Sequence, residues 1–98
     1  MFTGLVRKSL DDDEYRALQL ILLLRPEQGP LIPGSGGLRK IRWAKEGRGK
    51  RGGLRVIYYW DKLSSRCFML FLYAKNEQGD LTPTQVRTLA RLVREEFL

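Results

Sequence analysis

Arginine and lysine are concentrated in one short stretch of the chain. Between Arg39 and Arg55 the sequence holds eight basic residues and one acid, Glu46, so these 17 residues carry the whole net charge of +7. A concentrated excess of positive charge is typical of proteins that bind a polyanion, because it can neutralise several phosphates at once. We therefore predict an RNA, DNA or phosphate partner for this segment. A solvated charged loop is the alternative interpretation.

The residue types that are missing limit the chemistry further. The chain has no histidine and a single cysteine, Cys67. Catalysis by a histidine-dependent triad is therefore excluded, and a zinc site would need a rare set of carboxylate ligands. Because Cys67 has no partner for an internal disulfide, it fits a reducing cytoplasm. We expect no cofactor and no metal.

Four cations are predicted to converge on one surface of a small sheet. They are Lys40 and Arg42 on one predicted strand, Arg55 at the start of the next, and Lys75 at the end of a third. Pairing of the first two strands as a hairpin can bring Lys40, Arg42 and Arg55 to one face. Such a face would suit a phosphodiester. The alternative is that each cation is an edge charge that limits aggregation.

A glycine-rich basic turn separates the first two predicted strands. Residues Gly47 to Gly52 match the pattern G-x-G-x-x-G, but dinucleotide binding needs a helix after this pattern and a strand is predicted here. We expect the glycines instead to let the backbone approach a phosphate backbone closely. Most aromatic residues of the strands are expected in the core, with one or two available for base stacking. The candidate RNA-binding residues are Arg39, Lys45, Arg48, Lys50, Arg51, Tyr73 and Asn76.

The elements that position these residues follow from apolar periodicity and capping signals. Helical spacing predicts an amphipathic segment over Phe2–Leu10 and a second helix that ends before Pro26. Strands are predicted over Leu38–Ala44, Leu54–Trp60 and Cys67–Ala74. The last of these is apolar on both faces and is expected to be the central strand. Thr82, Pro83 and Gln85 form a capping box that predicts a C-terminal helix.

This order predicts one α+β domain over residues 1–98. It would contain an antiparallel sheet of three to four strands, an N-terminal helical hairpin and a C-terminal helix, with the helices packed on one face of the sheet. No apolar run approaches the roughly 18 residues that a membrane span needs, so we expect no membrane partner.

Several segments together resemble the HigB-like branch of the RelE toxin superfamily. They are GLRKIRWA from Gly37, GRGKRGG from Gly47, RVIYYW from Arg55, YAKNE from Tyr73 and DEYRALQ from Asp13. The resemblance implies a RelE-like fold and a type II toxin that acts as a ribosome-dependent mRNA endonuclease, or mRNA interferase. In this family the sheet enters the A site of the 30S/70S ribosome. The mRNA 2′-hydroxyl then attacks the adjacent phosphate without a metal ion.

The resemblance also implies roles for individual residues. Lys40 and Arg42 fall on the paired basic positions of the family's strand, and Arg55 falls on its phosphate-binding arginine. Lys75 falls near the last catalytic position, where better-studied members have an arginine next and this chain has Asn76. A lysine can act as general base when neighbouring cations lower its pKa.

The partners implied by the resemblance are mRNA, the ribosome and a cognate antitoxin with a helix-turn-helix domain. DNA would be bound only through that antitoxin. Family members usually begin with a strand that this chain lacks before Phe2. We therefore expect an exposed sheet edge, which an antitoxin segment could fill. Two alternatives stay open: a noncatalytic RNA- or ribosome-binding module, and an inactive family member that only binds its antitoxin.

Overall fold

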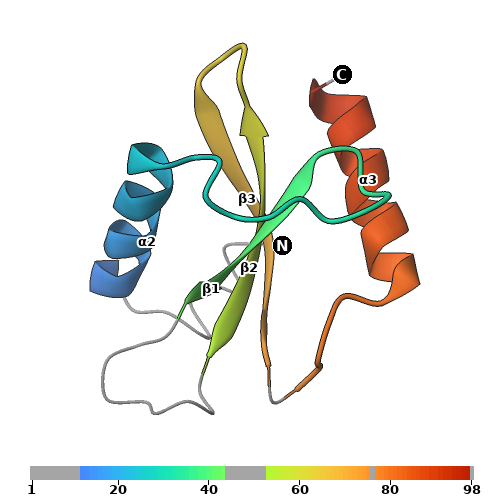
Figure 1. The fold of residues 1–98 in the computed structure, drawn as a ribbon, viewed down its shortest axis with the longest axis horizontal. Coiled ribbons are helices and arrows are strands. Elements are labelled where there is room, and N and C mark those ends of the chain that lie inside the picture. The colour runs from blue at the N-terminus through green and yellow to red at the C-terminus, as the bar shows by residue number, and fades with distance from the viewer. Residues whose placement is uncertain (1–11, 44–52, 76, 98) are drawn as a thin grey trace.

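The computed structural model describes residues 12–43, 53–75 and 77–97. Figure 1 shows a helix, three strands and a second helix in this order along the chain. They are α2 (Asp12–Leu24), β1 (Leu38–Trp43), β2 (Leu54–Asp61), β3 (Arg66–Ala74) and α3 (Pro83–Phe97). The predicted α+β class, the helix before Pro26 and the C-terminal helix are confirmed. The predicted helical segment Phe2–Leu10 lies outside the described residues.

Both helices begin with the signals that the sequence carries. Asp12, Asp13 and Glu14 occupy the first turn of α2, where negative charge interacts favourably with the helix dipole. At the start of α3 the Gln85 N–H donates to Thr82 Oγ1 over 3.1 Å, and Gln85 Oε1 accepts from the Thr82 N–H over 3.0 Å. This reciprocal pair is the predicted capping box.

The three strands form one antiparallel sheet in the order β1-β2-β3. The central strand is therefore β2, and the prediction that residues 67–74 form the central strand is wrong for the described part of the chain. The apolar character of β3 has another cause, because both of its faces are covered. Leu72 packs in the cluster that contains α2, and Tyr73 packs in the cluster that contains α3.

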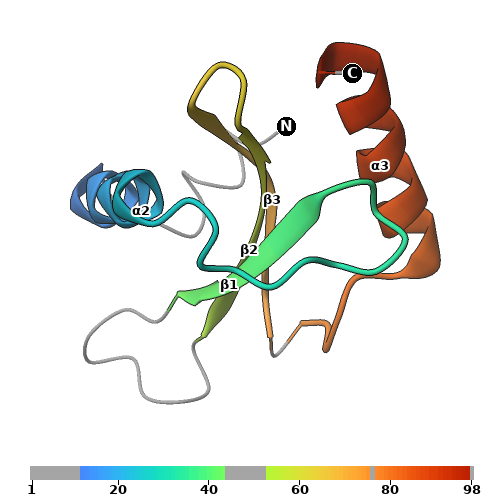
Figure 2. The same cartoon turned by 45° about the horizontal axis from the view of Figure 1, so that its top comes forward.

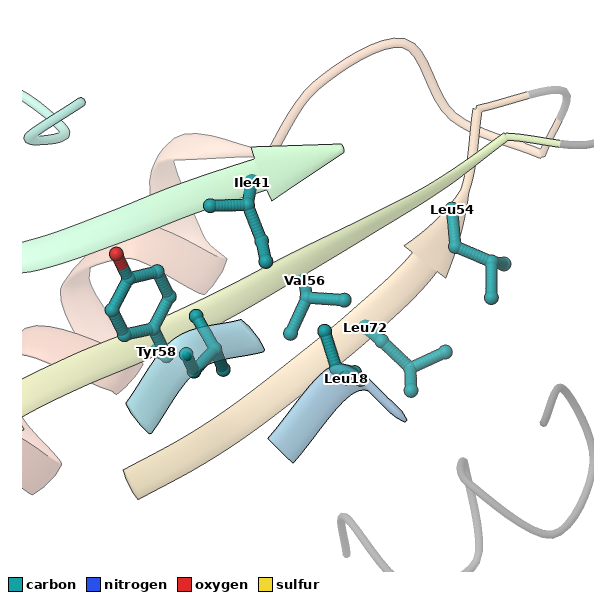
Figure 3. Close-up of a cluster of buried hydrophobic side chains, with 7 residues drawn as sticks. Leu18, Ile41, Leu54, Val56, Tyr58 and Leu72 are labelled. Atoms are coloured by element: carbon teal, nitrogen blue, oxygen red, sulfur yellow. The ribbon is translucent and has the colours of Figure 1, made fainter. Parts of the chain in front are cut away.

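The two helices cover opposite faces of the sheet (Figures 1 and 2). Figure 3 shows the cluster beneath α2, formed by Leu18, Leu22, Ile41, Leu54, Val56, Tyr58 and Leu72. The cluster beneath α3 is formed by Leu38, Ile57, Tyr73, Leu89 and Val93. The prediction that the helices share one face is wrong. Residues 56–60 of β2 are apolar or aromatic and point to alternate faces, so each face needs its own cover.

Hydrogen bonds hold the loop between α2 and β1 against the sheet. The Tyr58 hydroxyl is buried there, donates to the Pro26 carbonyl over 2.7 Å and accepts from the Gly29 N–H over 3.0 Å. A Cβ atom at Gly29 would lie 2.7 Å from Ile41 Cγ2 and 2.8 Å from the Lys40 carbonyl oxygen. Only glycine fits this close approach without a shift of the backbone. The loop segment 26–30 is therefore held beside β1, and we call this segment the wall.

Within the described residues, no helix is both long enough and apolar enough to cross a membrane.

Candidate functional site

A cleft of about 480 Å³ opens between this wall and the cationic half of the β1–β2 hairpin. Its lining residues are Gln28, Gly29, Pro30, Lys40, Ile41, Arg42 and Arg55. Three of the four cations that were predicted to converge therefore line one cleft. Among the described residues that line it there is no aspartate or glutamate, so the cleft favours an anionic ligand.

Arg42 and Arg55 lie directly opposite each other on β1 and β2. Like charges in this arrangement repel unless an anion lies between or beside them. Arg42 is exposed, whereas Arg55 is only 8% exposed. Within the described part of the chain, no carboxylate forms a salt bridge with either guanidinium. A largely buried cation without a counterion is costly, and a bound phosphate would relieve that cost.

Lys40 reaches a carboxylate that sequence analysis did not single out. Its Nζ donates to Asp80 Oδ1 over 3.2 Å, and Asp80 belongs to the loop between β3 and α3. The Leu81 backbone N–H, which donates to the same oxygen, and then Lys40 hold the pKa of the Asp80 carboxyl below its usual value. The one local signal for Asp80 is its position just before the Thr82 cap, which predicts a loop residue and nothing about Lys40.

Tyr73 lies opposite Arg55 on β3 and is 5% exposed. Burial raises the pKa of its phenol, the Asp80 charge raises it further, and Arg55 partly offsets both. The hydroxyl is buried without a well-formed hydrogen bond to any described residue, although Asp80 lies close enough to interact with it. Because the ring is enclosed, base stacking on Tyr73 would need a rearrangement. Its hydroxyl is the better candidate contact.

The other predicted site residues differ in placement. Lys75 is exposed just beyond β3, and its backbone N–H donates to the Gly53 carbonyl, so it lies at the same end of the sheet as Arg55. Arg39 donates through Nη1 to the carbonyls of Gly29 and Glu27 and also pairs with the Glu27 carboxylate. It therefore supports the wall of the cleft, and its contact with RNA stays a prediction. Lys45, Arg48, Lys50, Arg51 and Asn76 lie outside the described residues.

The arrangement suits phosphate recognition. An arginine presents two parallel N–H donors to two phosphate oxygens, and a lysine adds a point charge. In the described ranges, no three histidine, cysteine, aspartate or glutamate side chains lie where they could hold a metal ion together. The side chains at the cleft can therefore bind a phosphodiester and stabilise extra negative charge on it.

Residues 32–97 match the family model of the RelE toxin of the RelE/RelB toxin–antitoxin system. The match spans 66 of the 98 residues and contains β1, β2, β3 and α3 with every cation of the cleft. The chain therefore belongs to the RelE toxin family. It is a toxin of a toxin–antitoxin system, and the family implies an antitoxin as its partner.

Proposed function

We propose that this toxin is an endoribonuclease of the HigB-like branch that cleaves mRNA in the ribosomal A site. The observation that carries the proposal is Arg55. It is a cation with 8% exposure that lines the cleft, and within the described residues it has no carboxylate partner. A phosphodiester would supply both the missing charge and acceptors for the guanidinium fork.

The proposed reaction needs no nucleophile from the protein. The mRNA 2′-oxygen forms a bond to the adjacent phosphorus, and the bond from phosphorus to the 5′-oxygen breaks. The products are a 2′,3′-cyclic phosphate and a free 5′-hydroxyl. The proton of the 2′-hydroxyl passes to a base, and a proton reaches the departing 5′-oxygen. Since the substrate supplies the attacking oxygen, a chain without histidine can carry out this reaction.

The side chains in and near the cleft fit separate parts of this reaction. Arg55 and Arg42 would hold the phosphate and stabilise the charge that grows on it in the transition state. Lys40 and Lys75 are the candidates for proton transfer. The Tyr73 phenol has a raised pKa, so it stays protonated at neutral pH and could donate a hydrogen bond to a phosphate oxygen.

The proposed partners follow the same reasoning. The ribosome would present the mRNA, and the basic residues between Arg39 and Arg55 would contact RNA phosphates. The proposed antitoxin carries a helix-turn-helix domain, through which alone the complex would bind DNA. All of these partners belong to the cytoplasm. The four cations of the sheet would then act as catalytic residues, and the basic turn would act in binding.

Expression in a bacterial host tests this proposal. The wild-type chain should arrest growth and produce new mRNA 5′ ends within translated reading frames. Arg55→Ala and Arg55→Lys should lose both effects, because lysine keeps the charge without the bidentate fork. Arg66→Ala removes an exposed arginine at the opposite end of β3 and should behave as wild type. Arrest without new ends would favour the noncatalytic RNA- or ribosome-binding alternative. Neither arrest nor new ends from the wild-type chain would favour the inactive antitoxin-binding one.

A further inference from the structure

We propose that Asp80 is a positioning residue that fixes the Lys40 ammonium at the rim of the cationic cleft. The effect of this pair on RNA cleavage rests on the proposed nuclease function. The pairing itself can be measured without any cleavage. It concerns a residue in the loop between β3 and α3, outside the four cations and the basic turn that the sequence singles out.

Lys40 needs such a partner if it is to act at a defined place. Its strongly hydrated ammonium group sits on a flexible stem of about four carbons, so the ammonium of an unpaired lysine samples many positions. In the structure its Nζ lies 3.2 Å from Asp80 Oδ1, and the Lys40 side chain is 31% exposed. The two residues are 40 positions apart in the chain, so the contact depends on the fold.

Asp80 is itself held in place from two sides. Its Oδ1 accepts the Leu81 backbone N–H over 2.8 Å, and its carbonyl accepts Gln78 Nε2 over 2.8 Å. Gln78 Nε2 also donates to Gln85 Oε1 over 2.9 Å, and Gln85 belongs to the capping box of α3. An incidental surface ion pair has no such anchoring and contributes little. Here the Leu81 N–H holds the carboxylate, and Gln78 connects the Asp80 backbone to the capping box of α3.

Strand register relates Asp80 and Lys40 to the face of the sheet that carries Arg55. The Tyr73 hydroxyl is buried, and the Asp80 charge raises the pKa of its phenol while Arg55 lowers it. Tyr73 and Arg55 are directly paired across β3 and β2. Asp80 contacts Lys40, which lies on the same face of the sheet as Arg42, Arg55 and Tyr73.

Asp80→Asn and Glu77→Gln make a matched pair of variants for the test. Both remove one negative charge from the same loop, and Glu77 is exposed and forms no salt bridge with a described residue. On mRNA programmed in purified ribosomes, Asp80→Asn should lower the single-turnover rate roughly ten- to a hundredfold, because a misplaced group loses its orientation. The affinity for the ribosome should change less than about twofold. Glu77→Gln should match wild type, and Asp80→Glu should restore part of the rate.

A double-mutant cycle tests whether Asp80 acts through Lys40. Lys40→Met should lower the rate, and Asp80→Asn should lower it no further in that background. Additive losses would overturn the inference, as would an Asp80→Asn variant that binds and cleaves RNA better than wild type. The second outcome would mean that Asp80 competes with the phosphate. Equal thermal melting temperatures of all variants exclude loss of fold as the cause.

A second measurement does not depend on activity. The isolated protein is labelled with ¹⁵N-lysine, and the Lys40 ammonium resonance is assigned by its loss in Lys40→Arg. This resonance should shift in Asp80→Asn and stay unchanged in Glu77→Gln. An unchanged resonance in Asp80→Asn would overturn the pairing. A shifted resonance in a chain that cleaves no RNA would instead contradict the proposed nuclease and leave the Asp80–Lys40 pair established.

Discussion

At the scale of single residues, the site combines buried groups that the fold leaves without partners. Arg55 is a largely buried cation, and Tyr73 carries a buried hydroxyl, and neither is satisfied by a strong partner among the described residues. Buried polar groups are nearly always hydrogen-bonded, and exceptions cluster where a ligand completes the site. The two residues are paired across neighbouring strands. We therefore interpret them as two halves of one phosphate contact.

The Tyr73→Phe variant separates the effect of the Tyr73 hydroxyl on RNA cleavage from its effect on stability. Removal of a buried and poorly satisfied hydroxyl should leave the free energy of unfolding unchanged or raise it by about 1 kcal/mol. The cleavage rate should fall at the same time, because a donor to the phosphate is lost. Chemical denaturation and single-turnover cleavage measure the two effects. A variant that is less stable and equally active would show that the hydroxyl serves the fold alone.

At the scale of elements, the loop between α2 and β1 decides the shape of the cleft. Tyr58 and Arg39 bind its backbone from the sheet, and Gly29 allows the approach. The side chain of Arg39 is thereby committed to the wall. The loop supplies three lining residues of the cleft, so its position sets the space beside Lys40 and Arg42.

Gly29→Ala tests this dependence on close approach. The new methyl group would overlap Ile41 Cγ2 and the Lys40 carbonyl, so the loop must move away from β1. We expect a loss of about 1–3 kcal/mol in the free energy of unfolding, as for other overpacked sites, and weaker RNA cleavage. Gly79→Ala is the matched control, because beyond its two chain neighbours no residue lies within 4 Å of its added Cβ. Equal free energies of unfolding for the two variants would contradict the claim that close packing of Gly29 against β1 fixes the loop.

The local elements could be predicted from the sequence because their signals are local. The capping box at Thr82 and Gln85, and the alternation of Lys40 and Arg42, need only a few neighbouring residues. The layer arrangement could not be derived in this way. An apolar strand such as β3 could lie in the centre of the sheet, or at its edge with both faces covered by helices. Only the tertiary structure decides between these two arrangements.

Whole-molecule contacts explain why the sequence predicts the cations of the candidate site but not Asp80. The cations on β1 and β2 are brought together by one hairpin, so strand pairing alone predicts their meeting. Asp80 contacts Lys40 because α3 and Leu81 pack against the sheet and bring the loop before α3 next to β1. No spacing rule connects two residues across such a distance in the chain.

At the same scale, helices cover the two faces of the sheet (Figure 1). The cationic cleft lies toward the end of the sheet where Arg42 and Arg55 pair. If the proposed function is right, RNA contacts the end of the sheet where Arg42, Arg55 and Lys75 lie. The described part of the opposite end carries Arg66 and the turn after Asp61, which have no place in the proposed reaction.

The central claim is that Arg55 binds the phosphate that is cleaved, and purified components test it most directly. Ribosomes programmed with a defined mRNA are mixed with the wild-type chain, Arg55→Gln or Arg66→Gln, and the cleaved ends are analysed. The account predicts a cut in the A-site codon with a 2′,3′-cyclic phosphate. It also predicts a rate at least about a hundredfold lower for Arg55→Gln and wild-type behaviour for Arg66→Gln. Cleavage by Arg55→Gln at the wild-type rate, or ribosome binding by the wild-type chain without any cleavage, would contradict it.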